Sequence, residues 1–291
     1  MANTFNNSKQ GWGGNWTEKK LIAFEKYVNA YLTIIEKHPF NTIYFDAFAG
    51  SGERIKQTEL YNQLSILNED EHVYKGAAER VISLNKKFDW YYFIEKDVKS
   101  RDNLEKKLCE IAPDLQDRCV FRQEDCNLQL LELAKASKKH DLASLIFLDP
   151  FGMQIDWNSI EELKNTRSDI WILIPTGVIV NRLLDRKGEL KHINKLESFF
   201  GLTEKEIREE FYEKEVQKTL FGEENEIIKK VINPINKIAN LYIKNLGNIW
   251  KYVTPTPLRL NNSKGSPIFH FVFASNNSSA VKIAQQIIKK L

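Results

Sequence analysis

Short apolar runs alternate with amphipathic stretches along the first two thirds of the chain. The runs are rich in aromatic and β-branched residues, which is typical of buried strands, and the stretches between them repeat their apolar positions at helical spacing. Regular alternation of this kind predicts an α/β fold with a mostly parallel, doubly wound sheet. The predicted strands begin at Thr42, Trp90, Val120, Leu142 and Ile170.

The regions outside this alternation have patterns of their own. Residues 1–40 predict a loose polar arm and then an amphipathic helix that starts near Asn15. Residues 177–246 are charged and helical in pattern, so we expect a helical insertion that forms one wall of a substrate cleft. Ile249–Val253 and Pro267–Ala274 predict a C-terminal antiparallel hairpin that completes the sheet. We interpret residues 1–291 as a single domain.

Composition narrows the classes of protein that fit. A formal net charge of +3 over 291 residues is a weak basic balance, unlike that of a dedicated nucleic-acid-binding protein. Cys109, Cys119 and Cys126 lack metal-ligand spacing, so no metal site is predicted. No apolar run reaches the length of a membrane span, and the N-terminus is polar. We expect a soluble cytoplasmic protein with no membrane partner.

The first predicted strand leads into the most informative motif. It ends on Asp46 and continues as Phe48-Ala49-Gly50-Ser51-Gly52. Glycines after a strand let the backbone turn tightly and approach a ligand closely. The loop lacks the lysine of a phosphate-binding loop, and Ile55 replaces the third glycine of a dinucleotide fold. An acid at the strand tip suits a ligand with a positive charge or free hydroxyls. The loop resembles the first motif of class I S-adenosylmethionine (SAM) methyltransferases.

Two further strand ends carry acids. In a Rossmann-like sheet, an acid after the second strand faces the ribose of a bound nucleoside, which makes Glu95, with Lys96 beside it, a candidate cofactor-binding residue. In the SAM-binding fold, an acid after the third strand contacts the adenine amino group. Asp125 is expected to have that role, and Cys126 to line the ring. Asp125 also fits a simple helix cap, and the two roles are compatible.

The fourth strand delivers Asp149-Pro150-Phe151-Gly152 at the point where ligands bind in doubly wound sheets. Methyltransferases that modify exocyclic amines of bases have an aromatic residue after a D/N-P-P motif. Here a single proline places Phe151 one residue early. We expect Asp149, Pro150 and Phe151 to form the catalytic motif, with Asp149 also close to the cofactor. Asp149 would accept a hydrogen bond from a substrate amino group, and Phe151 would stack on a flat ring.

At family level, the chain resembles the three-Cys-motif partner proteins (TcmP). The resemblance rests on Trp16-Thr17-Glu18-Lys19-Lys20-Leu21, Phe45–Gly52, Phe147–Gly152 and Phe273-Ala274-Ser275, which together span most of the chain. It implies a Rossmann-like class I methyltransferase fold, SAM as cofactor, and a partner that carries a three-cysteine, radical-SAM-like motif. The family's cysteines belong to that partner, so the three cysteines here acquire no role from it.

Three functions remain open at this stage. The preferred one is a SAM-dependent methyltransferase that acts on an amino group of a nucleic-acid base or a nucleotide-like ring. The second is a non-catalytic partner subunit that keeps the SAM fold. The third is a Mg²⁺-dependent hydrolase or nuclease, which would require Asp46, Asp125 and Asp149 to converge on one ion.

Overall fold

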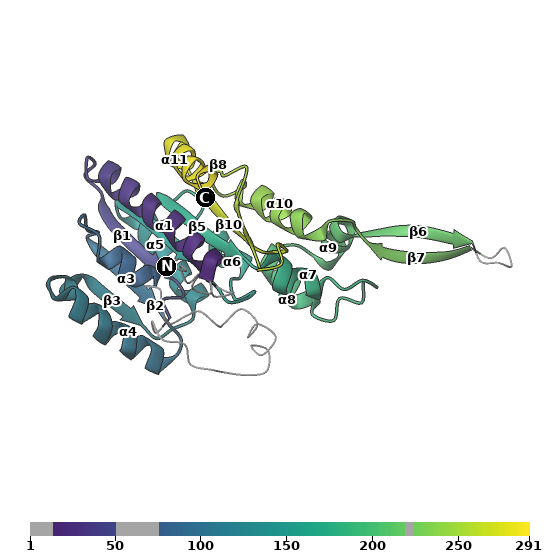
Figure 1. Cartoon of the computed structure of the whole chain (residues 1–291), viewed down its shortest axis with the longest axis horizontal. Coiled ribbons are helices and arrows are strands. Elements are labelled where there is room, and N and C mark those ends of the chain that lie inside the picture. The colour runs from purple at the N-terminus through teal and green to yellow at the C-terminus, as the bar shows by residue number, and fades with distance from the viewer. Residues whose placement is uncertain (1–13, 51–75, 219–223) are drawn as a thin grey trace, which may run out of the picture.

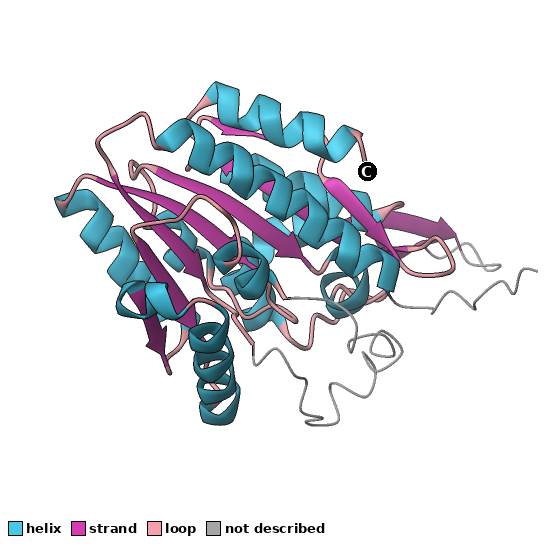
Figure 2. Ribbon diagram, turned by 60° about the vertical axis from the view of Figure 1, so that its left-hand side comes forward, coloured by secondary structure: helices cyan, strands magenta, loops and turns pink. Residues whose placement is uncertain are grey.

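The computed structural model describes residues 14–50, 76–218 and 224–291, and its centre is an eight-stranded sheet (Figures 1 and 2). The strand order is β3-β2-β1-β4-β5-β10-β8, and β9 also pairs with β10. The strands are β1 (Asn41–Asp46), β2 (Trp90–Ile94), β3 (Cys119–Arg122), β4 (Leu142–Leu148), β5 (Ser168–Ile174), β8 (Tyr252–Val253), β9 (Leu258–Asn261) and β10 (Pro267–Ser275).

Strands β1 to β5 are all parallel, and β10 runs antiparallel to β5. Because β8 is antiparallel to β10, it runs in the same direction as β5. A parallel 3-2-1-4-5 sheet followed by an antiparallel strand is the order found in Rossmann-like class I methyltransferases. The predicted fold class is therefore confirmed, and it rests on strand order rather than on any single motif.

Helices cover both faces of the sheet, as a doubly wound fold requires (Figure 2). Strand residues alternate between two cores: Tyr44 and Phe147 point to one face, and Phe45 and Ile146 to the other. The first face is covered by α1 (Gly14–Ile35), α3 (Ala77–Ile82), α4 (Val98–Ile111) and α11 (Ser278–Lys289), and the 3-10 helix η2 (Pro113–Arg118) follows α4. The second is covered by α5 (Cys126–Lys139), α6 (Trp157–Glu161), α8 (Ile193–Phe200), α9 (Glu204–Phe211) and α10 (Pro234–Leu246).

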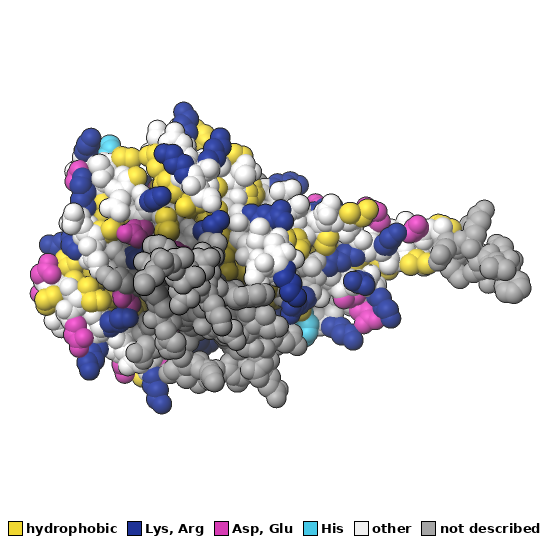
Figure 3. All heavy atoms as spheres, viewed as in Figure 1, with side chains coloured by type: hydrophobic (Ala, Val, Ile, Leu, Met, Phe, Trp, Pro, Cys, Tyr) yellow, Lys and Arg dark blue, Asp and Glu magenta, His cyan; other side chains and the backbone are white. Residues whose placement is uncertain are grey.

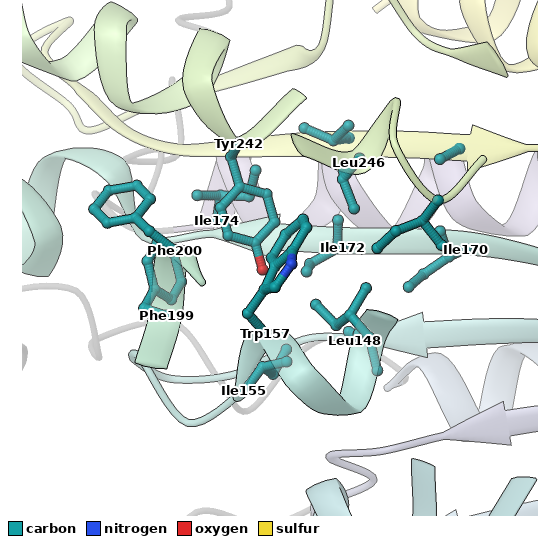
Figure 4. Packing of buried hydrophobic residues seen from close by; sticks show 14 of the residues in the cluster. Leu148, Ile155, Trp157, Ile170, Ile172, Ile174, Phe199, Phe200, Tyr242 and Leu246 are labelled. Carbon is teal, nitrogen blue, oxygen red and sulfur yellow. The ribbon is translucent and has the colours of Figure 1, made fainter. Parts of the chain in front are cut away.

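The insertion between β5 and β8 is packed onto the sheet through aromatic side chains. Trp157 of α6 meets Tyr242 of α10 edge to face at 5.4 Å, above the aliphatic side chains of β4 and β5 (Figure 4). Gly201 ends α8 with φ +65°, and a Cβ there would lie 2.1 Å from the Trp157 ring. Only glycine allows the chain to turn this close to the indole.

The structure differs from the prediction of an all-helical insertion. Besides π-helix η3 (Thr176–Val180), α7 (Asn181–Leu183), α8, α9 and α10, the insertion contains the two-stranded hairpin of β6 (Tyr212–Lys218) and β7 (Glu224–Lys230), which projects from the body (Figure 1). Its sequence lacks the alternation of a half-buried strand, and Val216, Ile227 and Ile228 are exposed. Charged pairs such as Lys229 with Glu215 replace apolar contacts.

The C-terminal hairpin also differs in detail. The main partners are β9 and β10, whereas β8 is only two residues long. Trp250, which was predicted to lie in a strand, is buried and donates from Nε1 to the Ser168 carbonyl at 2.9 Å. Its side chain therefore anchors the segment in the core instead of extending the sheet. In the described part of the chain, no helix is both long and apolar enough to cross a membrane.

Candidate active site

The predicted site residues gather at the carboxyl edge of the sheet. In the sheet register, Asp46 of β1 lies opposite Phe93 of β2 and Phe147 of β4. Glu95 and Asp149 each follow those partners by two residues, so the acidic ends of β2 and β4 flank the end of β1. This is the edge at which ligands bind in doubly wound sheets.

Asp46 is buried beneath the glycine loop. Its Oδ2 accepts a hydrogen bond from the Tyr44 hydroxyl at 2.9 Å, and its Oδ1 accepts one from the Phe48 backbone N–H at 3.2 Å. Burial raises the pKa of this carboxyl to about 7, although both hydrogen bonds act in the opposite direction. Asp46 thus holds the backbone at Phe48, and its carboxyl titrates near neutral pH.

Glu95 ties the glycine loop to the second strand. Its Oε2 accepts from the Gly50 backbone N–H at 3.1 Å, and its Oε1 accepts from the Asp97 N–H at 2.9 Å. The backbone N–H of Ala49 donates to the Ile94 carbonyl at 3.0 Å. Each carboxylate oxygen can accept a second hydrogen bond, so Glu95 retains acceptor capacity for ligand hydroxyls.

Gly50 has a conformation that favours glycine, with a φ of +66°. Of the residues that the structure describes, none would lie within 4 Å of a Cβ added there. The arrangement combines this glycine position with two acidic groups. Gly52 of the predicted cofactor motif lies outside the described residues.

Asp125 caps helix α5, as the sequence allowed, by accepting from the Asn127 backbone N–H at 2.9 Å. Lys96 lies 3.8 Å from its other oxygen, and both side chains are substantially exposed. Cys126 is buried, with its Sγ 3.8 Å from the Gln154 carbonyl, and burial raises the pKa of its thiol to about 12. The thiol is therefore a neutral packing group between α5 and the loop after β4.

A residue that the sequence reasoning missed completes the site. Lys20 of α1 forms an ion pair with Oδ2 of Asp149, and its side chain is only 5% exposed. Its ammonium lies 5.6 Å from the centre of the Trp16 ring, which stacks on Phe269. The signal was present in the helical spacing, because Lys20 lies in the apolar stripe between the partly buried Trp16 and the buried Phe24 and Tyr27.

In the rest of the Asp-Pro-Phe-Gly motif, only Phe151 is an exposed residue. Pro150 is buried, whereas Phe151 is 43% exposed and its backbone N–H donates to Gln154 Oε1 at 3.0 Å. A Cβ on Gly152 would lie 3.1 Å from Ile179 Cδ1, so this loop packs closely against η3. π-Helical turns of this kind are frequent at functional sites.

The arrangement does not suit a divalent metal. The hydrolase hypothesis needs three carboxylates around one ion, and no such group of His, Cys, Asp or Glu occurs among residues 14–50, 76–218 and 224–291. In addition, the Lys20 ammonium lies against Asp149. A cation already pairs with the carboxylate that a metal would need.

Comparisons with known proteins give fold-level similarity only. No protein-family model and no curated protein matches the chain. A solved structure of a Legionella pneumophila DUF519 protein is 15% identical, with a TM-score of 0.42, covering 91% of this chain and 98% of that one. Trm1 from Pyrococcus horikoshii, solved with S-adenosyl-L-methionine, is 10% identical, with a TM-score of 0.40, covering 90% and 57%. A conserved Streptococcus pyogenes protein is 16% identical, with a TM-score of 0.31, covering 51% and 78%.

At these identities and scores the neighbours carry no conclusion about activity. Membership of the three-Cys-motif partner family stays a prediction. From its own strand order, the chain has a methyltransferase-like fold with a cluster of acids at the ligand-binding edge.

Proposed function

We propose that the protein is a SAM-dependent methyltransferase that acts on an amino group of a nucleic-acid base or nucleotide-like ring. The observation that carries the proposal is the group of acids at the carboxyl edge of the sheet: Glu95 and Asp46 hold the glycine loop, and Asp149 follows the neighbouring strand β4. SAM supplies an electrophilic methyl group on a positively charged sulfonium. Acceptors for ribose hydroxyls and nearby negative charge are what such a ligand requires.

The chain's own residues would then divide into a cofactor half and a substrate half. Glu95 would accept the ribose hydroxyls, and Asp125 and Cys126 would border the adenine. With Lys20 holding Oδ2 of Asp149, Oδ1 has no partner among the described residues and would accept a hydrogen bond from the substrate amino group. Phe151 would stack on the ring that carries that amino group, so that its nitrogen faces the methyl group.

Calorimetric titration with SAM and S-adenosylhomocysteine tests the cofactor half. We expect micromolar binding by the wild type and at least tenfold weaker binding by Asp46→Asn and Glu95→Gln, whereas Asp149→Asn should bind SAM normally but lose methyl transfer. Wild-type affinity in both of the first two variants would overturn the assignment of the site.

The same titration distinguishes the methyltransferase proposal from the alternative that the protein is a non-catalytic partner subunit. On the resemblance alone, we propose a three-cysteine, radical-SAM-like protein as a partner. A folded sample that binds neither SAM nor S-adenosylhomocysteine would favour a non-catalytic subunit of that partner. Binding of both ligands by the isolated chain would favour an enzyme.

A further inference from the structure

A basic segment leads away from the candidate site toward the root of the β6–β7 hairpin. It comprises residues 182–195, here called the basic loop, and it follows η3 along the chain. Because η3 packs against Gly152, the segment begins next to the Asp-Pro-Phe-Gly motif. Figure 3 shows Lys and Arg side chains gathered on the surface between the body and the hairpin.

Charge is concentrated in this segment. It holds five Lys or Arg residues against two acids, Asp185 and Glu189. Asp185 is occupied by backbone N–H groups, and Glu189 forms an ion pair with Lys191 at 3.3 Å. Arg186, Lys187 and Lys195 are exposed and have no ion-pair partner in the described part of the chain. The chain as a whole is nearly balanced in charge, so the excess here is local.

Hydrogen bonds hold the backbone of the basic loop against α9 and the root of the hairpin. Asp185 accepts from the N–H groups of Lys187 at 2.8 Å and Leu190 at 2.7 Å, which closes the loop on itself. Arg208 donates to the Gly188 carbonyl at 2.7 Å, and Tyr212 to the Asp185 carbonyl at 2.9 Å. Its base is also fixed from β7, where Lys230 donates to the Asn181 carbonyl at 2.6 Å. A backbone that is already held in this way needs no further ordering when the exposed cations of the loop bind an anion.

We propose that the basic loop binds the phosphate backbone of a nucleic-acid strand and delivers one of its bases to Asp149 and Phe151. The inference rests on the proposed function and specifies its substrate as a polymer rather than a free nucleotide. Phosphates contribute most of the affinity of such interfaces, and exposed Arg and Lys are their usual partners. An exposed aromatic ring at the neighbouring site fits a base taken out of its stack.

Fluorescence anisotropy with labelled 20-nucleotide single strands of RNA and of DNA tests the inference. In Arg186→Gln/Lys187→Gln, we expect at least tenfold weaker binding at low salt, and a slope of log Kd against log salt concentration reduced by about 1 to 1.5. Stronger binding of one strand type identifies the substrate polymer.

The matched control is Lys37→Gln/Lys139→Gln. It removes the same charge from two exposed lysines that precede β1 and β4, at the opposite edge of the sheet. This variant should bind within about threefold of the wild type, as expected for charges outside a contact. Equal losses in both variants, or no binding of either strand by the wild type, would overturn the inference.

The strand-binding experiment and the SAM titration can fail independently of each other. The basic-loop variant should keep its SAM affinity, because neither side chain belongs to the cofactor half. SAM binding without strand binding would reject the basic loop and leave the methyltransferase proposal standing. Strand binding through the basic loop without SAM binding would reject the proposed enzyme while retaining the surface.

Discussion

The most unusual residue of the site is a carboxylic acid whose negative charge is costly to the fold. Burial raises the pKa of Asp46 to about 7 from an ordinary value of 3.8. The protonated carboxyl is the form that the native state tolerates. The protein is therefore most stable with respect to this group below about pH 4, and that stability is lost as the pH rises through about 7. An ionised Asp46 under the glycine loop is useful only to a ligand that brings positive charge.

Replacing this acid by its neutral isostere should reveal the cost. We compare the free energy of unfolding of Asp46→Asn with that of the wild type at pH 4 and at pH 8. From pH 4 to pH 8 this difference should change in favour of the variant by on the order of 1 to 3 kcal/mol, because the variant cannot ionise. Urea denaturation at both pH values measures the change. An identical pH dependence in the two proteins would contradict the raised pKa.

Asp169 provides a matched control at the other end of the sheet. It is half-buried at the start of β5 and accepts from the Tyr27 hydroxyl at 2.5 Å, and desolvation of its carboxyl raises its pKa to about 6. Asp169→Asn should show a smaller gain in stability, completed at a lower pH. It should leave SAM affinity unchanged, whereas Asp46→Asn should weaken it at least tenfold.

The ion pair between Lys20 and Asp149 makes a second prediction at this scale. Lys20→Met leaves a partly buried carboxylate without its partner, so we expect a loss of about 1 to 3 kcal/mol in the free energy of unfolding. Lys20→Met/Asp149→Asn should recover part of that loss, because the remaining amide carries no charge. A double-mutant cycle by chemical denaturation measures the coupling, and additive losses would mean that the pair does not interact.

Among the elements, a tight junction joins α8 to α6. Gly201→Ala should destabilise the protein by about 2 to 4 kcal/mol, because the new methyl group would overlap the Trp157 ring and the backbone would be strained. Gly265→Ala is the control: its φ is also positive, at +77°, but a Cβ there meets no described residue within 4 Å. It should cost only about 1 kcal/mol, and equal losses would show that strain alone matters.

The hairpin should be separable from the body that carries it. We expect replacement of residues 215–227 by Asn-Gly to shift the unfolding midpoint by less than about 2 °C, because this part of β6 and β7 projects from the body (Figure 1). Tyr212→Phe is a far smaller change than this deletion, but it should lower the free energy of unfolding by about 1 kcal/mol. It removes the hydrogen bond to the Asp185 carbonyl at the root of the hairpin. A large loss on shortening would show that the hairpin supports the body.

The sequence predicted these elements unequally. The parallel strands and their acidic ends could be predicted because buried strands leave continuous apolar runs, and Asp46, Glu95 and Asp149 directly follow such runs. The projecting hairpin could not, because a ribbon without a core has no apolar period to detect. The partnership of Lys20 with Asp149 spans 129 positions and depends on how α1 lies on the sheet, which local patterns do not encode.

At the scale of the whole molecule, the sheet is closed late in the sequence. The outer edge of β5 is covered by β10, which pairs Phe271 with Leu173 and Phe273 with Trp171. Between β5 and β10 the chain makes the entire insertion, β8 and β9. The two helices that cover this region on one face, α1 and α11, therefore come from opposite ends of the described chain.

This order has a consequence during synthesis on the ribosome. Until the residues of β10 emerge from the exit tunnel, the nascent chain carries a β5 edge whose unpaired backbone and apolar side chains can capture another strand. Polypeptides that stall or terminate before Pro267 would keep that edge open and be substrates for chaperones and proteases. Among the described strands, β10 is thus the last to be translated, and it closes the edge of β5.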